Sequence, residues 1–244
     1  MKYKSECIIE SKYVQSNQYV RFPYFVRIFQ DAAFEHSKSL NAGVNELLKN
    51  NLAWVLYSMY IDVNSYPKLD DKIVTTTWCK GKKGITIERD YQVTNGEKSI
   101  LKATTVWVLF NIKERKAVQI PNSVVSMYQP ENYDILPNVK NKLPYDKDIK
   151  YEFNYNFKTR FLDLDSNDHV NNITYIDYVC TALYRILKTQ IFIKTFNIIF
   201  KKEITFSNTE IEVKMSLNTD MCNFKITEGN NIFSYGYLTY RYWS

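Results

Sequence analysis

The stretch Asp163-Leu-Asp-Ser-Asn-Asp-His-Val-Asn-Asn172 lies between a segment that alternates like a strand and a segment with helical spacing. It contains three acids, three asparagines and one of the two histidines of the chain. Asp165, Asn167 and His169 are two residues apart, so an extended backbone would direct all three side chains to one face. A carboxylate, an amide and an imidazole together could carry out hydrolysis. The same composition is typical of a polar loop that caps a helix, and composition alone favours that structural interpretation.

The bulk composition predicts a strand-rich globular protein. The chain has 244 residues, enough for one large domain or two of about half that length. It contains 20 Tyr, 14 Phe and 4 Trp but only six Gly and six Pro, a mixture that favours strands over disorder. The net charge of +6 is not gathered into a basic stripe, so we expect no nucleic-acid partner.

The cysteines and the apolar runs indicate a cytoplasmic protein. Cys7, Cys79, Cys180 and Cys222 are scattered, without the close pairs of a metal site. We therefore expect four buried, reduced thiols and no bound metal. Residues 1–7 lack the apolar core of a signal peptide. No run approaches the roughly eighteen apolar residues of a membrane span, so none is expected.

The first half of the chain predicts a strand, a helix and then antiparallel strands. The helix begins near Pro23, has apolar residues such as Phe25 and Phe29 at helical spacing, and ends near Gly43. His36 lies on the same apolar stripe, which favours a structural role. The strands are expected at 5–14, 52–63, 72–79, 85–93 and 99–111.

The second half repeats this order with an offset near 150 residues. A strand with alternating aromatic residues covers 151–158, and a helix covers 173–187. Further strands are expected at 198–206, 210–217, 223–226 and 232–242. Tyr19-Val20 before the first helix lines up with His169-Val170 before the second. The repeat indicates an internal duplication, and a sheet wrapped around one long helix, present twice, is an α+β double hot-dog fold.

Four of the six prolines mark the boundary between the two halves. Pro121, Pro130, Pro137 and Pro144 are separated by polar residues, which is typical of a connector on the surface. We therefore expect an N-terminal hot-dog domain at 1–125, a linker at 126–147 and a C-terminal hot-dog domain at 148–244.

The polar stretch resembles the catalytic segment of the acyl-[acyl-carrier-protein] thioesterases, a plant-type family that also has bacterial members. Their segment reads roughly Asp-Leu-Asp-x-Asn-x-His-Val-Asn-Asn-x-x-Tyr, and Asp163 to Tyr175 agree with it at every specified position. Phe200-Lys-Lys-Glu203 is similar to the acidic motif of the second half of the family. First-half landmarks are similar at Asn51 to Leu56, Tyr66-Pro67, Asp71, Trp78 and Arg89-Asp90.

This resemblance implies hydrolysis of fatty acyl thioesters of the carrier protein, which would terminate fatty acid synthesis. It implies a catalytic set of Asp165, Asn167, His169 and Glu203, with the choice of general base between the two acids left open. Ile204 occupies the position where a cysteine nucleophile was once proposed for the family. An oxyanion would lie at the helix N-terminus, near Asn171 and Asn172. No cofactor is implied, since the substrate carries its own phosphopantetheine.

The resemblance also implies sites for both parts of the substrate. The acyl chain would bind in the first half, where Phe25, Phe29, Trp54 and Trp78 are candidate lining residues that could equally fill the core. The carrier protein is acidic, so a positive docking face is expected. Its candidates are Lys80, Lys82, Lys83, Lys201 and Lys202.

Other functions fit the same fold. An acyl-coenzyme A thioesterase would need the same residues, and a non-catalytic acyl-binding or regulatory protein would need none of them. A dehydratase would need two complementary sites, but the first half offers only Val20-Arg-Phe-Pro23 where the second has His169 to Asn172. A homodimer is possible in each case.

Overall fold

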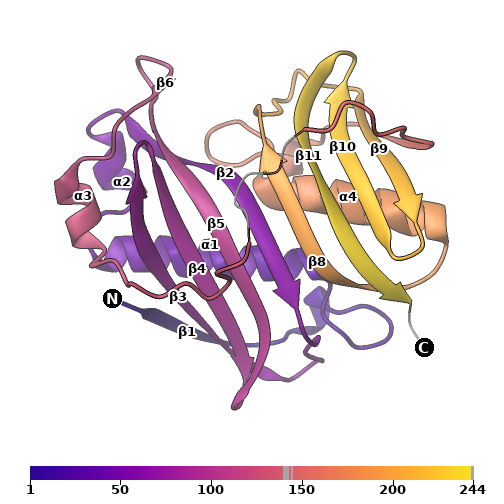
Figure 1. Cartoon of the computed structure of the whole chain (residues 1–244), viewed down its shortest axis with the longest axis horizontal. Coiled ribbons are helices and arrows are strands. Elements are labelled where there is room, and N and C mark those ends of the chain that lie inside the picture. Colours follow the sequence, from indigo (N-terminus) through magenta and orange to yellow (C-terminus); the bar gives the residue numbers. More distant parts are fainter. Residues whose placement is uncertain (140–142, 144, 243–244) are drawn as a thin grey trace. The chain divides into compact units, whose positions relative to one another are not determined.

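The computed structural model describes residues 1–139, 143 and 145–242. The chain divides into two compact units, Met1–Asn141 and Lys142–Ser244, and each contains one long helix and an antiparallel sheet (Figure 1). None of the helices in the described part of the chain is long and apolar enough to cross a membrane.

The first unit has a sheet with the strand order β1-β3-β4-β5-β2. The long helix α1 lies along this sheet (Figure 1). A short strand, β6, pairs with β5. The elements are β1 (Tyr3–Ile8), η1 (Ser11–Tyr13), α1 (Phe22–Ser39), α2 (Val44–Leu48), β2 (Leu52–Val63), β3 (Lys72–Lys83), β4 (Thr86–Asn95), β5 (Lys98–Asn111), β6 (Lys116–Ala117) and α3 (Asn122–Met127).

Helix α1 forms where the apolar spacing predicts it. Pro23 lies in its first turn, where a missing N–H costs nothing. Phe25, Phe29 and Ala32 are almost fully buried along one side of the helix. The hairpin between β4 and β5 turns at Gly96, whose φ of 58° is a conformation that glycine adopts without strain. Helix and hairpin thus follow from local sequence.

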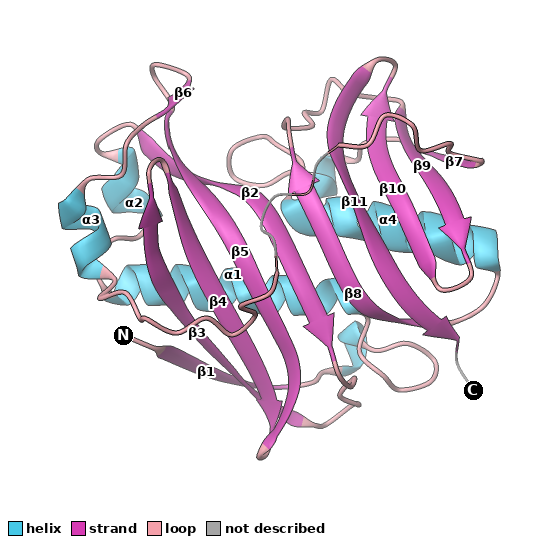
Figure 2. Ribbon diagram, in the orientation of Figure 1, coloured by secondary structure: helices cyan, strands magenta, loops and turns pink. Residues whose placement is uncertain are grey.

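The second unit has the same topology as the first. Read from its β7 edge, its strand order is β7-β9-β10-β11-β8, which is the order of the first unit with β1, β3, β4, β5 and β2 replaced in turn by their counterparts. Figure 2 shows α4 lying across this sheet. The elements are β7 (Phe153–Phe157), η2 (Phe161–Asp163), α4 (Asn172–Leu187), β8 (Ile191–Phe200), β9 (Ile211–Asn218), β10 (Met221–Glu228) and β11 (Asn231–Tyr242). The predicted double hot-dog fold is confirmed.

The duplication is clearest at the entrance to each helix. The short helices η1 and η2 begin at Ser11 and Phe161, and α1 and α4 begin at Phe22 and Asn172, so both pairs are offset by 150 residues. Each entrance also has one residue with positive φ, Gln18 at 67° and Asp168 at 59°. The two loops therefore have the same backbone course and differ in their side chains.

Strand β8 is placed differently from its prediction at 198–206. It begins at Ile191, directly after α4, and ends at Phe200. An apolar run gives no indication of where a strand starts within it, which explains the late predicted start. Residues 201–206 leave the sheet and form a loop that includes Glu203, so the acidic motif lies just beyond the end of a strand.

Part of the expected linker packs onto the first unit. Tyr128 and Ile135 are 2% and 4% exposed. The Ile135 backbone N–H donates a hydrogen bond to the Asp90 carboxylate at 3.0 Å. The division between the units lies at Asn141 and Lys142, so residues 126–139 belong structurally to the first unit. Residues 140–142 and 144 of the expected linker lie outside the described residues.

Candidate active site

The loop before α4 is a tight hairpin. Leu164 and Val170 form an antiparallel bridge, and the Asp165 N–H donates to the His169 carbonyl at 2.7 Å. The chain reverses at residues 166–168, where Asp168 has positive φ. The prediction that residues 165–169 form one continuous extended strand is therefore wrong, because a turn divides them into two short extended arms. Asp165 and His169 still share a face because they lie opposite each other across the hairpin, whereas Asn167 lies at the exposed tip.

The segment after β8 runs beside this hairpin. His169 and Thr205 form an antiparallel bridge, and the Val170 N–H donates to the Ile204 carbonyl at 2.8 Å. The register pairs His169 with Thr205 and Val170 with Ile204, so the next pair is Asn171 and Glu203. This pairing places Glu203 on the same face as His169. The backbone thus aligns Asp165, His169 and Glu203 along one face of three short extended segments.

The two candidate bases have different surroundings. The Asp165 carboxylate accepts hydrogen bonds from the backbone N–H groups of Asn167 at 2.8 Å and His169 at 3.4 Å, so it holds the hairpin in shape. Glu203 is exposed, and within the described residues no side chain pairs with its carboxylate. Glu203 is therefore the acid that is accessible to substrate and water.

The first turn of α4 leaves one backbone amide available. Asn171 is the N-cap, and its side-chain oxygen accepts from the Ile173 N–H at 2.9 Å. The Asn171 N–H donates to the Asp163 carbonyl at 2.8 Å, and the Thr174 N–H donates to the Asn171 carbonyl at 2.9 Å. Among the backbone N–H groups of residues 171–174, that of Asn172 alone has no acceptor in the part of the chain that is described. The expected oxyanion donor is thus narrowed to Asn172, because Asn171 already uses its N–H.

Asp163 has a structural role that sequence spacing could not separate from a catalytic one. It is 2% exposed and accepts from the Arg160 N–H, from the Arg160 guanidinium and from the Tyr178 hydroxyl, all within 3.0 Å. Burial would raise the pKa of Asp163, but the hydrogen bonds from Arg160 and Tyr178 outweigh it and hold the pKa below its usual value. Asp163 therefore fixes the loop to η2 and α4.

The equivalent loop of the first unit has the same backbone without the carboxylates and the imidazole. Val14 and Val20 form a bridge, as do Tyr19 and Lys68, and the Val20 N–H donates to the Pro67 carbonyl at 3.0 Å. In this alignment the positions of Asp165, His169 and Glu203 are occupied by Gln15, Tyr19 and Tyr66. A carboxylate and an imidazole at these positions therefore belong to the second unit alone.

Comparison with known proteins supports the same division into halves. Residues 1–128 match the acyl-ACP thioesterase N-terminal domain, and residues 146–237 match the acyl-ACP thioesterase C-terminal domain. The chain belongs to the acyl-ACP thioesterase family. Asp165, His169 and Glu203, which the backbone aligns, all fall within the C-terminal match.

Individual relatives agree in sequence and in fold. A chloroplastic acyl-[acyl-carrier-protein] hydrolase of Cuphea viscosissima is 33% identical over 65% of this chain and 41% of its own length, so the chain spans less than half of that relative. A putative oleoyl thioesterase from Lactobacillus plantarum matches with a TM-score of 0.88 at 17% identity, over 100% of this chain and 97% of its own. The 12:0-ACP thioesterase from Umbellularia californica matches with a TM-score of 0.87 at 21% identity, over 99% and 98%.

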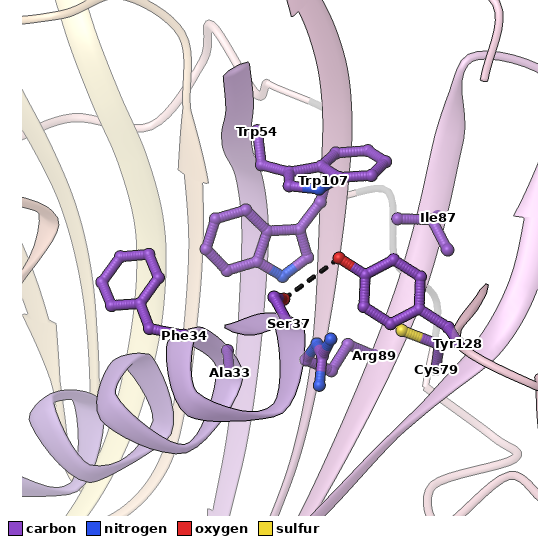
Figure 3. Close-up of a pocket in the computed structure, with 9 residues that line it drawn as sticks. All are labelled: Ala33, Phe34, Ser37, Trp54, Cys79, Ile87, Arg89, Trp107 and Tyr128. Atoms are coloured by element: carbon purple, nitrogen blue, oxygen red, sulfur yellow. Dashed lines mark hydrogen bonds between the residues drawn. The ribbon is translucent and has the colours of Figure 1, made fainter. Parts of the chain in front are cut away.

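The first unit contains a pocket of about 370 Å³, part of it open to solvent. Of the four lining residues expected for an acyl chain, Trp54 lines this pocket. Phe25, Phe29 and Trp78 are at most 1% exposed and are not among the residues that line it. The residues around the pocket are Ala33, Phe34, Ser37, Trp54, Cys79, Ile87, Arg89, Trp107 and Tyr128 (Figure 3).

Polar groups that line the pocket already have hydrogen-bond partners. Figure 3 shows the hydrogen bond between the Ser37 and Tyr128 hydroxyls, which is 3.0 Å long. The Arg89 guanidinium is buried, and its Nη1 donates to Nδ1 of His36 at 2.9 Å. Among the described residues, no carboxylate forms an ion pair with Arg89. His36 thus has the structural role expected from the sequence.

His36 gives a testable pH dependence of stability. Burial and then the Arg89 charge lower the pKa of His36 to about 4, whereas in the unfolded chain it is about 6.5. The unfolded chain therefore binds a proton first, and stability is lost as the pH falls from about 6.5 toward 4. We expect the free energy of unfolding to drop by about 2 kcal/mol more between pH 7 and 4.5 in wild type than in His36→Gln. Urea unfolding at both pH values measures this, and equal drops in the two proteins would contradict it.

Two of the docking candidates in the first unit, Lys80 and Lys83, form ion pairs with carboxylates of the same unit. Lys80 lies at a bulge in β3, and its ammonium pairs with Glu88 at 3.0 Å, Asp134 at 3.0 Å and Asp90 at 3.5 Å. With 12% of its side chain exposed, Lys80 is unsuited to docking, which corrects that part of the expectation. Lys83 also pairs with Glu88, at 2.9 Å.

The remaining lysine candidates differ in setting. The Lys82 ammonium donates to the Ile120 carbonyl at 3.0 Å. Lys201 and Lys202 are exposed, directly before Glu203. The second unit therefore presents two positive charges next to Glu203.

The cysteines have no features of an activated nucleophile. Cys79 and Cys222 are buried, whereas Cys7 and Cys180 are half-buried, so the expectation of four buried thiols holds for two of them. Burial raises the pKa of all four, which disfavours the thiolate.

Proposed function

We propose that the protein hydrolyses fatty acyl thioesters of acyl carrier protein, releasing a free fatty acid and the carrier-protein thiol. Membership of the acyl-ACP thioesterase family supports this. The observation that carries it is the alignment of Asp165, His169 and Glu203 beside the start of α4, where the duplicate in the first unit has neither a carboxylate nor an imidazole. Release of the free acid would terminate fatty acid synthesis.

The proposed chemistry assigns one role to each group. The thioester oxygen accepts a hydrogen bond from the Asn172 N–H, and the positive end of the α4 dipole stabilises its developing charge. Glu203 takes a proton from water as the water oxygen bonds to the carbonyl carbon. The carbon–sulfur bond then breaks, and the proton passes to the leaving thiolate. His169 and Asn167 position substrate and water, while Asp165 holds the hairpin. The reaction as proposed needs no metal or cofactor.

The pocket of the first unit is the proposed acyl-binding site. Its walls include Trp54, Trp107 and Ile87, which suit an alkyl chain because they offer apolar surface. Phe25, Phe29 and Trp78 are assigned to the core.

Lys201 and Lys202 are the proposed docking residues for the acidic carrier protein. We expect the double substitution Lys201→Glu and Lys202→Glu to raise KM for acyl-carrier protein by about tenfold, because it replaces attraction by repulsion at the interface. KM for the matching coenzyme A thioester should change by less than about twofold. Lys68→Glu, an exposed lysine of the first unit, is the control. An equal rise for both substrates would contradict docking at this pair.

The function is tested by thiol release from carrier-protein and coenzyme A thioesters of equal chain length. A higher kcat/KM for the carrier-protein substrate is expected. A clear preference for coenzyme A would favour an acyl-coenzyme A thioesterase instead. A cytoplasmic location and a homodimer stay predictions, which cell fractionation and sedimentation velocity can test.

A further inference from the structure

Tyr175 makes two hydrogen bonds that enclose Glu203. Its hydroxyl accepts from the Ile204 N–H at 2.9 Å and donates to the Lys202 carbonyl at 3.1 Å. These are the peptide groups on either side of Glu203 in the loop after β8. Tyr175 is 2% exposed, and its ring contacts Phe200 edge-on with centroids 5.4 Å apart. The hydroxyl therefore reaches the Glu203 loop from a rigid helix.

The charges near Tyr175 belong to the candidate site. Burial is the main reason that the pKa of Tyr175 is raised, and the negative charges of Glu203 and Asp165 add to it. Both carboxylates thus lie close enough to act on this hydroxyl. Neither forms a hydrogen bond with it, so Tyr175 acts on Glu203 through the backbone.

The duplicated loop of the first unit provides an internal comparison. The 150-residue offset between the helices places Phe25 at the position of Tyr175, and the bridges of the two loops place Tyr66 at the position of Glu203. Phe25 and Tyr66 contact each other edge-on, with ring centroids 5.4 Å apart. The aromatic ring is thus present in both units, whereas the hydroxyl accompanies only the loop that bears a carboxylate. A ring that served packing alone would not need the hydroxyl.

We propose that Tyr175 is a positioning residue that fixes the Glu203 backbone so that its carboxylate stays directed at the substrate. This role rests on the proposed function. The loop is otherwise exposed from Lys201 to Glu203. The backbone N–H groups of Lys201 and Lys202 donate to the Phe233 carbonyl at 2.8 and 3.2 Å, whereas the Tyr175 hydroxyl holds the two peptide groups of Glu203 itself. A small displacement of a general base is costly to the reaction.

Tyr175→Phe tests the role because it removes the hydroxyl and keeps the ring. We expect kcat to fall about tenfold while KM stays within about twofold, since binding does not depend on the base. In a Glu203→Gln background the same substitution should cause no further loss, because both changes affect one group. A further loss in that background would indicate a general structural effect and overturn the proposal.

Two controls separate positioning from folding. Tyr24→Phe removes a hydroxyl of α1 that donates a hydrogen bond to the Cys7 sulfur at 3.7 Å, its single hydrogen bond among the described residues, and should leave kcat unchanged. In wild type, the Ile204 amide hydrogen should exchange slowly with solvent deuterium because it is bonded to the Tyr175 hydroxyl. Fast exchange there would overturn the positioning role even if Tyr175→Phe does not fold. An active wild type with full kcat in Tyr175→Phe overturns the positioning role alone, whereas an inactive wild type overturns the proposed function.

Discussion

Glu203→Gln is expected to lower kcat for acyl-carrier protein hydrolysis by about a hundredfold or more. The amide keeps the size of the side chain but cannot accept the proton of the attacking water. Glu203 is exposed and lies in a loop outside the sheet, so the substitution should leave the unfolding transition unchanged. Initial rates and urea unfolding of wild type and variant measure both quantities.

Asp165→Asn is the matched comparison for Glu203→Gln. An asparagine oxygen can still accept from the Asn167 N–H, as the Asp165 carboxylate does at 2.8 Å, so the hairpin is preserved. We therefore expect a loss of about tenfold, smaller than for Glu203→Gln. A larger loss at Asp165 than at Glu203 would contradict the assignment of the base and give that role to Asp165.

Asp163→Ala is expected to reduce the free energy of unfolding of the second unit by about 3 kcal/mol. The substitution leaves the buried Tyr178 hydroxyl without its partner and detaches the guanidinium of Arg160 from η2. Urea unfolding monitored by far-UV circular dichroism measures the change.

Two other substitutions show whether the loss of stability in Asp163→Ala arises because Asp163 is buried. Asp168→Asn, at the exposed turn where φ is 59°, should change the unfolding free energy by less than about 0.5 kcal/mol. Arg160→Ala should cost less than Asp163→Ala, since 72% of its side chain is exposed and exposed charge pairs contribute little. Equal unfolding of Asp163→Ala and wild type would contradict the structural role.

The repeated architecture was predictable because it depends on local periodicity. Helix α1 follows from Pro23 and the buried spacing of Phe25 and Phe29, and the hairpin at Gly96 follows from turn chemistry. Both units show the predicted order of strand, helix and strands. Strand boundaries inside apolar runs were harder to predict, because every residue of such a run is equally compatible with a strand. Strand β8, for example, begins seven residues before its predicted start.

The site was predictable in its residue types but not in its geometry. Spacing by two indicated that Asp165 and His169 share a face, yet the reason is a hairpin that reverses at Asp168 and not an extended strand. Local sequence could not show that the Asn171 N–H is already bonded to Asp163, nor that Lys80 is buried among three carboxylates. These facts depend on tertiary neighbours, which spacing along one segment does not report.

The most direct test of the central claim is thiol release from palmitoyl-carrier protein by wild type and His169→Ala side by side. Release by wild type, with at least tenfold less by the variant, is the result that a hydrolytic site in the second unit predicts. No release by wild type, on carrier-protein or coenzyme A thioesters of several chain lengths, would contradict it and favour an acyl-binding protein.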